Sequence, residues 1–213
     1  PGSEAHPGGG LPVNRSDLFM TDETTAAARF FVVTGGPGAG KSTLIAALAQ
    51  AGYATSVEAG RGVIQDQVAI GGGALPWGDK AAFAELMLGW EMRSHHLARV
   101  AASKSGGPVF FDRGVPDVAG YLALEGLPVP AHVARAVERF RYHRRAFIAP
   151  PWPEIFRRDG ERRQDLDEAV RTYEAMVAAY GAAGYELVEI PRVAVEVRER
   201  FVLRMVGEAG GIG

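Results

Sequence analysis

Short apolar runs alternate with longer stretches of helical periodicity from residue 29 onward. The runs are rich in aromatic and β-branched residues, which favours strands. Strands are expected at Phe30–Thr34, Tyr53–Val57, Val109–Phe111, Arg145–Ile148 and Gly184–Ile190. Helices are expected at Lys41–Gln50, Val115–Leu124, Ala131–Phe140, Asp165–Tyr180 and Val193–Val206. A long helical region is also expected after the second strand. It breaks at Gly71–Gly73 and Pro76, and resumes from an N-cap at Asp79 to Ser103. This alternation predicts an α/β fold with a five-stranded parallel sheet and helices on both faces.

One domain of ordinary size accounts for a chain of 213 residues. Residues 1–28 lack apolar periodicity and include Gly8-Gly9-Gly10, so a flexible N-terminal tail is expected there. The domain is expected to span residues 29–208, with a short tail at 209–213. We find no internal repeat and no sign of a second domain.

A glycine-rich motif follows the first expected strand. Gly35-Gly36-Pro37-Gly38-Ala39-Gly40-Lys41-Ser42 fits the GxxxxGK[ST] pattern of a P-loop and leads directly into a helix. The glycines let backbone N–H groups converge on phosphate oxygens, and the helix N-terminus adds a positive dipole end. Lys41 is expected to reach the β- and γ-phosphates, Ser42 to bind Mg²⁺, and Thr43 to lie near the α-phosphate. The motif predicts a site for ATP with Mg²⁺.

Further polar residues follow the ends of the third and second expected strands. Asp112 ends an apolar strand, which is typical of a Walker-B metal ligand, although an aspartate here could also cap the next helix. Arg113 could clamp an acceptor or form a surface salt bridge. Glu58 could accept a hydroxyl proton from a substrate or simply begin a helix, and Arg61 follows it on the acceptor side. Glu58 is the preferred general base, with Asp112 as the alternative.

An arginine-rich segment separates the fourth strand from the next helix. It includes Arg158, Arg162 and Arg163, and we expect a lid over about residues 151–165. Arginines of a closing lid can neutralise the charge of a transferring phosphoryl group. The lid hypothesis assigns Arg158 to the nucleotide and Arg162 and Arg163 to catalysis. The alternative is a solvated charged loop.

Other polar and aromatic residues carry weaker signals. His95-His96 lacks the spacing of a metal site and is expected on a partly exposed helix surface. Trp77 and Trp152 each follow a proline and could stack on a ligand ring, or serve as packing anchors. Asp117 begins a DxxG match, but it is displaced from the strand end and is assigned no role.

Composition narrows the class of protein. The apolar fraction of 47% indicates an ordered globular chain, and the net charge of −2 argues against a dedicated nucleic-acid or membrane-surface binder. No apolar run approaches the roughly 20 residues of a membrane span. The absence of cysteine excludes thiolate chemistry and fits a reducing, cytoplasmic setting. Asn14 is the only asparagine, so the NKxD box of GTPases is absent.

Several of these segments together resemble a known family. The chain resembles bacterial predicted ATPases of the AAA-domain type over five segments. These are Val32 to Thr43, Glu58 to Arg61, Phe111-Asp112-Arg113-Gly114 to Asp117, Pro150-Pro151-Trp152 to Glu161-Arg162-Arg163-Gln164, and Gly184 to Leu187. These proteins are similar to nicotinamide riboside kinase and to deoxynucleoside kinase-like P-loop kinases. The resemblance implies that Asp112 and Arg113 form the strand-end motif, that Glu58 is the acceptor-side carboxylate, and that Arg162 and Arg163 belong to the lid. Gly114 stands where such kinases usually have serine.

The combined prediction is a kinase that transfers the γ-phosphoryl group of ATP to a hydroxyl of a small-molecule acceptor. Lys41, Asp112, Glu58, Arg113, Arg162 and Arg163 are the predicted catalytic residues, and Glu58, Arg61 and Arg113 the predicted acceptor contacts. Two alternatives stay open: an ATP-hydrolysing switch that binds a partner, and a nucleic-acid end kinase based on the arginine patch.

Overall fold

Five parallel strands form the centre of the molecule. The computed structural model describes residues 27–156 and 165–210. Within it the strand order is β2-β3-β1-β4-β5, and every pairing is parallel. The strands are β1 (Phe30–Gly35), β2 (Ala54–Thr55), β3 (Val109–Asp112), β4 (Arg145–Ala149) and β5 (Glu186–Glu189). The predicted five-stranded parallel sheet is confirmed.

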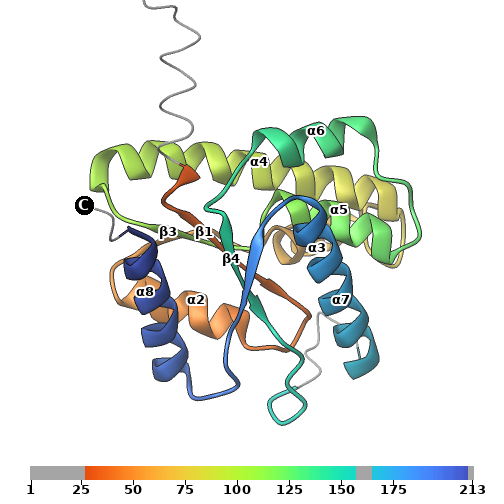
Figure 1. Ribbon diagram of the computed structural model, residues 1–213. Coiled ribbons are helices and arrows are strands. Elements are labelled where there is room, and N and C mark those ends of the chain that lie inside the picture. The colour runs from red at the N-terminus through yellow and green to blue at the C-terminus, as the bar shows by residue number, and fades with distance from the viewer. Residues whose placement is uncertain (1–26, 157–164, 211–213) are drawn as a thin grey trace, which may run out of the picture.

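Helices cover both faces of this sheet (Figure 1). They are α2 (Lys41–Gln50), α3 (Ala59–Ile70), α4 (Lys80–Ser105), α5 (Val115–Leu124), α6 (Ala131–Arg139), α7 (Leu166–Ala182) and α8 (Val195–Gly210). Helices α2 and α8 pack together on one face, whereas α3 to α7 lie on the other. None of these helices, within the described ranges, is long and apolar enough to cross a membrane.

The alternating side chains of β1 explain the two layers of core. Phe30 and Val32 belong to the cluster beneath α3 to α7, and Phe31 and Val33 to the cluster beneath α2 and α8. Successive strand residues point to opposite faces, so a strand with helices on both sides must be apolar throughout. All six residues of β1 are buried.

The edge strands are shorter than the sequence pattern predicts. We expected a strand over Tyr53–Val57, but β2 has two residues, which pair with Val109 and Phe110 of β3. Among the described residues no strand pairs with its outer side, and Val57 is 68% exposed. At the other edge, β5 is likewise restricted to Glu186–Glu189. An edge strand is held from one side alone, so pairing ends sooner than the apolar run does.

The ends of the helices largely follow the predicted signals. Asp79 caps α4 as expected, since its side chain accepts a hydrogen bond from the Ala82 N–H at 2.9 Å. Asp165 does the same for α7 through the Glu168 N–H at 2.8 Å. The functional segments follow the carboxyl ends of β1, β2, β3 and β4, where ligands bind in open parallel sheets.

Candidate active site

Backbone geometry restricts the P-loop to glycine at its two ends. Gly35 has a φ of 123°, and a Cβ atom there would lie 2.3 Å from the carbonyl oxygen of Ala149. Gly40 has a φ of 73° and precedes α2 directly. Other residues would be strained in both places. The loop therefore wraps closely around the N-terminus of α2, as phosphate binding requires.

Lys41 and Ser42 begin α2 beneath this loop. Lys41 is buried, and its Nζ donates a hydrogen bond to the Gly36 carbonyl at 2.6 Å. The Ser42 hydroxyl donates to Oδ2 of Asp112 at 3.4 Å. The end of β3 thus places a carboxylate beside the P-loop serine. Asp112 does not cap α5, because Gly114 is the N-cap and Asp117 accepts its N–H.

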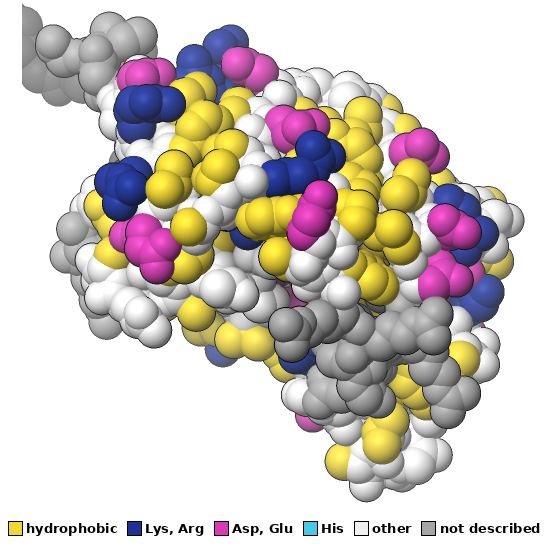
Figure 2. Space-filling model, turned by 90° about the horizontal axis from the view of Figure 1, so that it is seen from below, with side chains coloured by type: hydrophobic (Ala, Val, Ile, Leu, Met, Phe, Trp, Pro, Cys, Tyr) yellow, Lys and Arg dark blue, Asp and Glu magenta, His cyan; other side chains and the backbone are white. Residues whose placement is uncertain are grey.

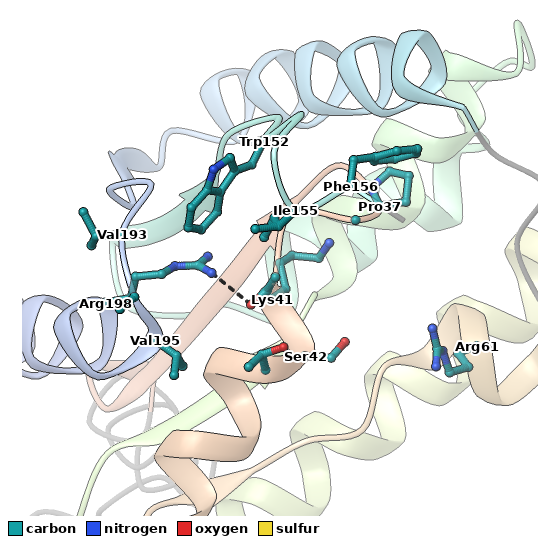
Figure 3. Close-up of a pocket in the computed structure, with 14 residues that line it drawn as sticks. Pro37, Lys41, Ser42, Arg61, Trp152, Ile155, Phe156, Val193, Val195 and Arg198 are labelled. Carbon is teal, nitrogen blue, oxygen red and sulfur yellow. Dashed lines mark hydrogen bonds between the residues drawn. The ribbon is translucent and has the colours of Figure 1, made fainter. Parts of the chain in front are cut away.

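A cavity of about 540 Å³ opens beside the P-loop (Figure 3). Lys41, Ser42 and Thr43 line one end, and the segments after β4 and β5 line the other. Those segments contribute Trp152, Ile155, Phe156, Val193, Ala194 and Val195. The first end offers the Lys41 ammonium group and the P-loop amides, which suit a polyphosphate. The other end offers apolar side chains, which suit a ring attached to that polyphosphate. We call this space the donor cavity.

A second cavity of about 270 Å³ adjoins the first, and Pro37 lines both. Its walls are largely apolar and aromatic, and its polar groups come from the N-cap of α3, from α5 and the residues that flank it, and from α7. The lining residues are Pro37, Glu58, Gly60, Ile64, Pro76, Trp77, Phe83, Met87, Arg113, Asp117, Tyr121, Leu124, Glu125, Glu168, Thr172 and Met176. We call it the acceptor cavity, since it suits a small ring compound with polar substituents.

Arg113 holds the polar end of the acceptor cavity in place. Its Nε donates to Oε1 of Glu58 at 3.2 Å, and its Nη1 donates to Oδ1 of Asp117 at 2.9 Å. Burial acts to lower the pKa of Arg113, but the carboxylates of Glu58 and Asp117 outweigh it and raise the pKa above its ordinary value. Arg113 also has a φ of 74°, which is uncommon for a residue other than glycine. Such strain persists where surrounding contacts fix the residue, as they do here.

Asp117 is the centre of this network, and the sequence analysis missed it. Besides Arg113, it accepts hydrogen bonds from the Thr34 hydroxyl at 2.6 Å, the Tyr180 hydroxyl at 2.6 Å and the Gly114 N–H at 3.0 Å. These donors come from β1, α7 and the start of α5. A reading of Asp117 as the N3 residue of α5, beside the strand-end motif, could have signalled this role.

Glu58 and Arg61 begin the same helix but face different cavities. Glu58 is the N-cap residue of α3, yet its side chain makes no capping hydrogen bond and lines the acceptor cavity instead. Arg61 lines the donor cavity with Ser42 and Thr43. The structure thus brings Glu58 and Arg113 together and places Arg61 apart from them.

The remaining predicted positions are the arginines of the expected lid and two tryptophans. Arg158, Arg162 and Arg163 lie outside the described residues, so the arginine lid stays a prediction. Trp152 lines the donor cavity, and Trp77, which is 58% exposed, lines the acceptor cavity.

The expectation of a partly exposed His95 is wrong. This residue is 7% exposed, contacts the Arg141 carbonyl at 2.9 Å through Nε2, and packs edge-on against Phe30. His95 occurs on α4 where the helix passes over the aromatic core. Tertiary packing therefore buries a side chain that the local sequence pattern predicted to be partly exposed.

The oxygens at the P-loop fit magnesium. Ser42 Oγ and Asp112 Oδ2 face each other, and both are hard oxygen donors of the kind that Mg²⁺ takes. No group of three or more His, Asp or Glu side chains suited to a metal occurs among the described residues.

Comparison with known proteins identifies structures of similar fold. Solved structures with a similar fold include a NadR protein in complex with NR, with a TM-score of 0.66 and 16% identity over 94% of this chain and 60% of that chain. Another is deoxyadenosine kinase from M. mycoides with dCMP and dCDP bound, with a TM-score of 0.56 and 11% identity over 84% of this chain and 99% of that one. The chain thus spans 60% of the length of the NadR protein. A search of curated proteins gave no match. Residues 30–198 match the profile of a family described as AAA domain, and this P-loop protein therefore belongs to that family.

Proposed function

We propose that this protein is an ATP-dependent kinase that transfers a phosphoryl group to a hydroxyl of a small molecule. The observation that carries the proposal is the pair of cavities that meet at Pro37. One contains the P-loop, and the other contains Glu58 and Arg113 within an apolar wall. A phosphoryl donor and an acceptor bound in them would face each other across the loop, and such positioning is a large part of phosphoryl-transfer catalysis.

Residues of the donor cavity would bind and orient the triphosphate. The P-loop amides and Lys41 would hold the β- and γ-phosphates, and Ser42 and Asp112 would hold Mg²⁺, directly or through water. Bound Mg²⁺ would supply charge neutralisation on the phosphate oxygens. Arg61 faces this cavity, so it is available to the transferring group rather than to the body of the acceptor.

Residues of the acceptor cavity would position the hydroxyl. Glu58 would accept its proton, because its carboxylate lines the cavity and is oriented by Arg113 at 3.2 Å. Arg113 is in turn fixed by Asp117. Trp77, Phe83 and Tyr121 offer flat apolar surface to the acceptor's ring.

The similar structures support an acceptor of modest size. One of those proteins is bound to NR and the other to dCMP and dCDP, which are small ring compounds. The acceptor cavity has a volume of about 270 Å³, which favours such a compound over a nucleic-acid end. Acidic and basic side chains of the described residues are mixed on the face shown in Figure 2.

A direct assay tests the proposal. The protein is incubated with Mg²⁺–ATP and a panel of nucleosides, sugars and amino alcohols, and both ADP and phosphorylated product are measured by mass spectrometry. We expect acceptor-dependent ADP formation with one phosphate added to one compound class. ATP hydrolysis that is independent of every acceptor, and stimulated by a protein partner, would instead indicate a switch ATPase.

Two variants show whether the measured activity belongs to this site. Lys41→Ala is expected to abolish turnover, and Asp112→Asn to lower it by about 10²-fold or more, the scale of a lost electrostatic contact in a transition state. Normal phosphotransfer in either variant would contradict the assignment. Asp66→Asn, an exposed change on α3, serves as the control.

A further inference from the structure

Two buried arginines lie at the active site, and their charges are balanced differently. The Arg113 side chain is 13% exposed and forms ion pairs with Glu58 and Asp117. Arg198, on α8, is 3% exposed and lines the donor cavity. The sequence analysis assigned it no role. Among the described residues, Arg198 forms no ion pair with a carboxylate.

The partners of Arg198 are uncharged. Its Nη1 donates to the Gly40 carbonyl at 3.2 Å, and its Nη2 donates to the Ala39 carbonyl at 3.1 Å. The guanidinium carbon lies 5.6 Å from the centre of the Trp152 ring. Its Nε is buried and has no hydrogen-bond partner. Figure 3 shows the side chain reaching from α8 beside Trp152 toward the P-loop.

A buried cation with neutral partners is costly. Burial lowers the pKa of Arg198, and no carboxylate of the described residues offsets that effect. Carbonyl dipoles satisfy two of its N–H groups but do not cancel its charge. An anion bound in the donor cavity would supply the missing countercharge.

We propose that Arg198 is a second cationic group of the donor site, beside Lys41, and that its charge is balanced by the polyphosphate of the bound nucleotide. This inference rests on the nucleotide site of the proposed function and adds a residue from the far end of the chain. Since Arg198 holds the carbonyls of Ala39 and Gly40, it also links α8 to the loop that binds the phosphates.

Binding measurements with three probes test the role of the charge. Isothermal titration calorimetry is performed with Mg²⁺–ATP, inorganic tripolyphosphate and adenosine on wild type and Arg198→Met. We expect the variant to bind ATP and tripolyphosphate at least 10-fold more weakly and adenosine within about twofold, because a polyphosphate, unlike adenosine, carries the countercharge. Unchanged ATP affinity in the variant would overturn the proposal.

Arg198→Lys separates charge from hydrogen-bond geometry. If the charge matters, lysine should keep tripolyphosphate affinity within about threefold of wild type, although it lacks the planar fork of arginine. A purely structural role predicts that lysine fails as methionine does, and that outcome would overturn the proposal. The lysine variant also serves if Arg198→Met does not fold.

Controls keep this inference distinct from the proposed function. Arg204→Met changes an exposed arginine of the same helix, and its nucleotide affinity should match wild type. If wild-type protein binds no ATP, the proposed function itself fails. If wild type binds ATP and phosphorylates an acceptor but Arg198→Met binds ATP equally well, the Arg198 inference alone is wrong.

Discussion

At the scale of single residues, buried carboxylates determine how the acceptor side is arranged. Asp117 accepts hydrogen bonds from four different residues and is 6% exposed. Each donor would lose a buried partner if this carboxylate were removed. Breaking a buried ion pair on one side leaves an uncompensated charge, which costs more than the pair is worth in net stability.

Replacement of Asp117 should therefore destabilise the fold. We expect Asp117→Ala to lower the free energy of unfolding by about 3–5 kcal/mol, because Arg113 keeps its charge but loses one of its two carboxylate partners. Chemical denaturation followed by circular dichroism measures the change. Asp66→Ala on the exposed side of α3 is the control. A loss below about 1 kcal/mol would contradict the role described for Asp117.

Glu91 provides a pH-dependent test at the same scale. This residue of α4 is 2% exposed, and burial first, then the nearby charge of Asp117, raises its pKa well above the ordinary 4.5. The folded state therefore favours the protonated form. Its contribution to stability is fully present below pH 4.5 and is lost as the pH rises through the folded-state pKa.

We expect Glu91→Gln to become more stable relative to wild type as the pH increases. The difference in the free energy of unfolding should be larger at pH 8 than at pH 5, because glutamine resembles the protonated acid and does not ionise. Urea titrations at the two pH values measure it. The exposed change Glu174→Gln should show no such trend, and a constant difference for Glu91→Gln would contradict the raised pKa.

At the scale of elements, close packing of α3 on α4 places the site. Glu58 and Arg61 lie at the N-terminus of α3, so the position of this helix decides what they face. Gly62 allows the approach: a Cβ atom there would lie 2.4 Å from the indole of Trp90. An added methyl group would therefore require the bulky indole ring, or the helix that carries it, to shift. The close approach of α3 to α4 therefore favours glycine, which has no Cβ atom, at position 62.

Two glycine substitutions should have opposite effects. Gly62→Ala should lower the free energy of unfolding, because overpacking costs about 1–3 kcal/mol and exceeds the gain in helix propensity. Gly89→Ala on α4 meets nothing within 4 Å, so it should raise stability by up to about 1 kcal/mol. Thermal and chemical denaturation measure both. Equal effects of the two changes would contradict the packing account.

At the scale of the whole molecule, the two cavities join both halves of the sheet. The donor cavity is lined by the P-loop, the helices α2, α3 and α8, and the segments that follow β4 and β5. The acceptor cavity is lined by α3, α4, α5 and α7 and by residues that flank them. Ligands in them would hold segments that are far apart in the sequence. A ligand that binds only the folded state stabilises it by an amount that rises with the logarithm of the ligand concentration relative to Kd.

Nucleotide should therefore raise the unfolding temperature of the entire domain. A non-hydrolysable ATP analogue with Mg²⁺ at 100 times its Kd should add about 2.7 kcal/mol to the free energy of unfolding. Differential scanning fluorimetry measures the shift, and an acceptor should add to it when nucleotide is present. Lys41→Ala should reduce the nucleotide shift, and a full shift in that variant would argue against binding at the P-loop.

The sequence by itself determined the fold class, the P-loop and the strand-end residues Asp112 and Arg113. Their signals are local: the apolar period of a strand, the spacing of glycines before a helix, and a charge where an apolar run stops. The same reasoning found Glu58 but could not show which cavity it faces. Local patterns also overestimated the length of β2, because the pairing with β3 decides where this edge strand ends.

Only the tertiary structure placed Asp117 and Arg198 in the linings of the two cavities and His95 in the core. Arg198 lies 158 residues from Gly40, whose carbonyl it binds, so no local spacing connects them. Asp117 matters because β1, α5 and α7 converge on it, and His95 is buried because α4 crosses an aromatic cluster. Burial and partnership arise when distant segments pack together. They are properties of the folded chain that sequence periodicity does not encode.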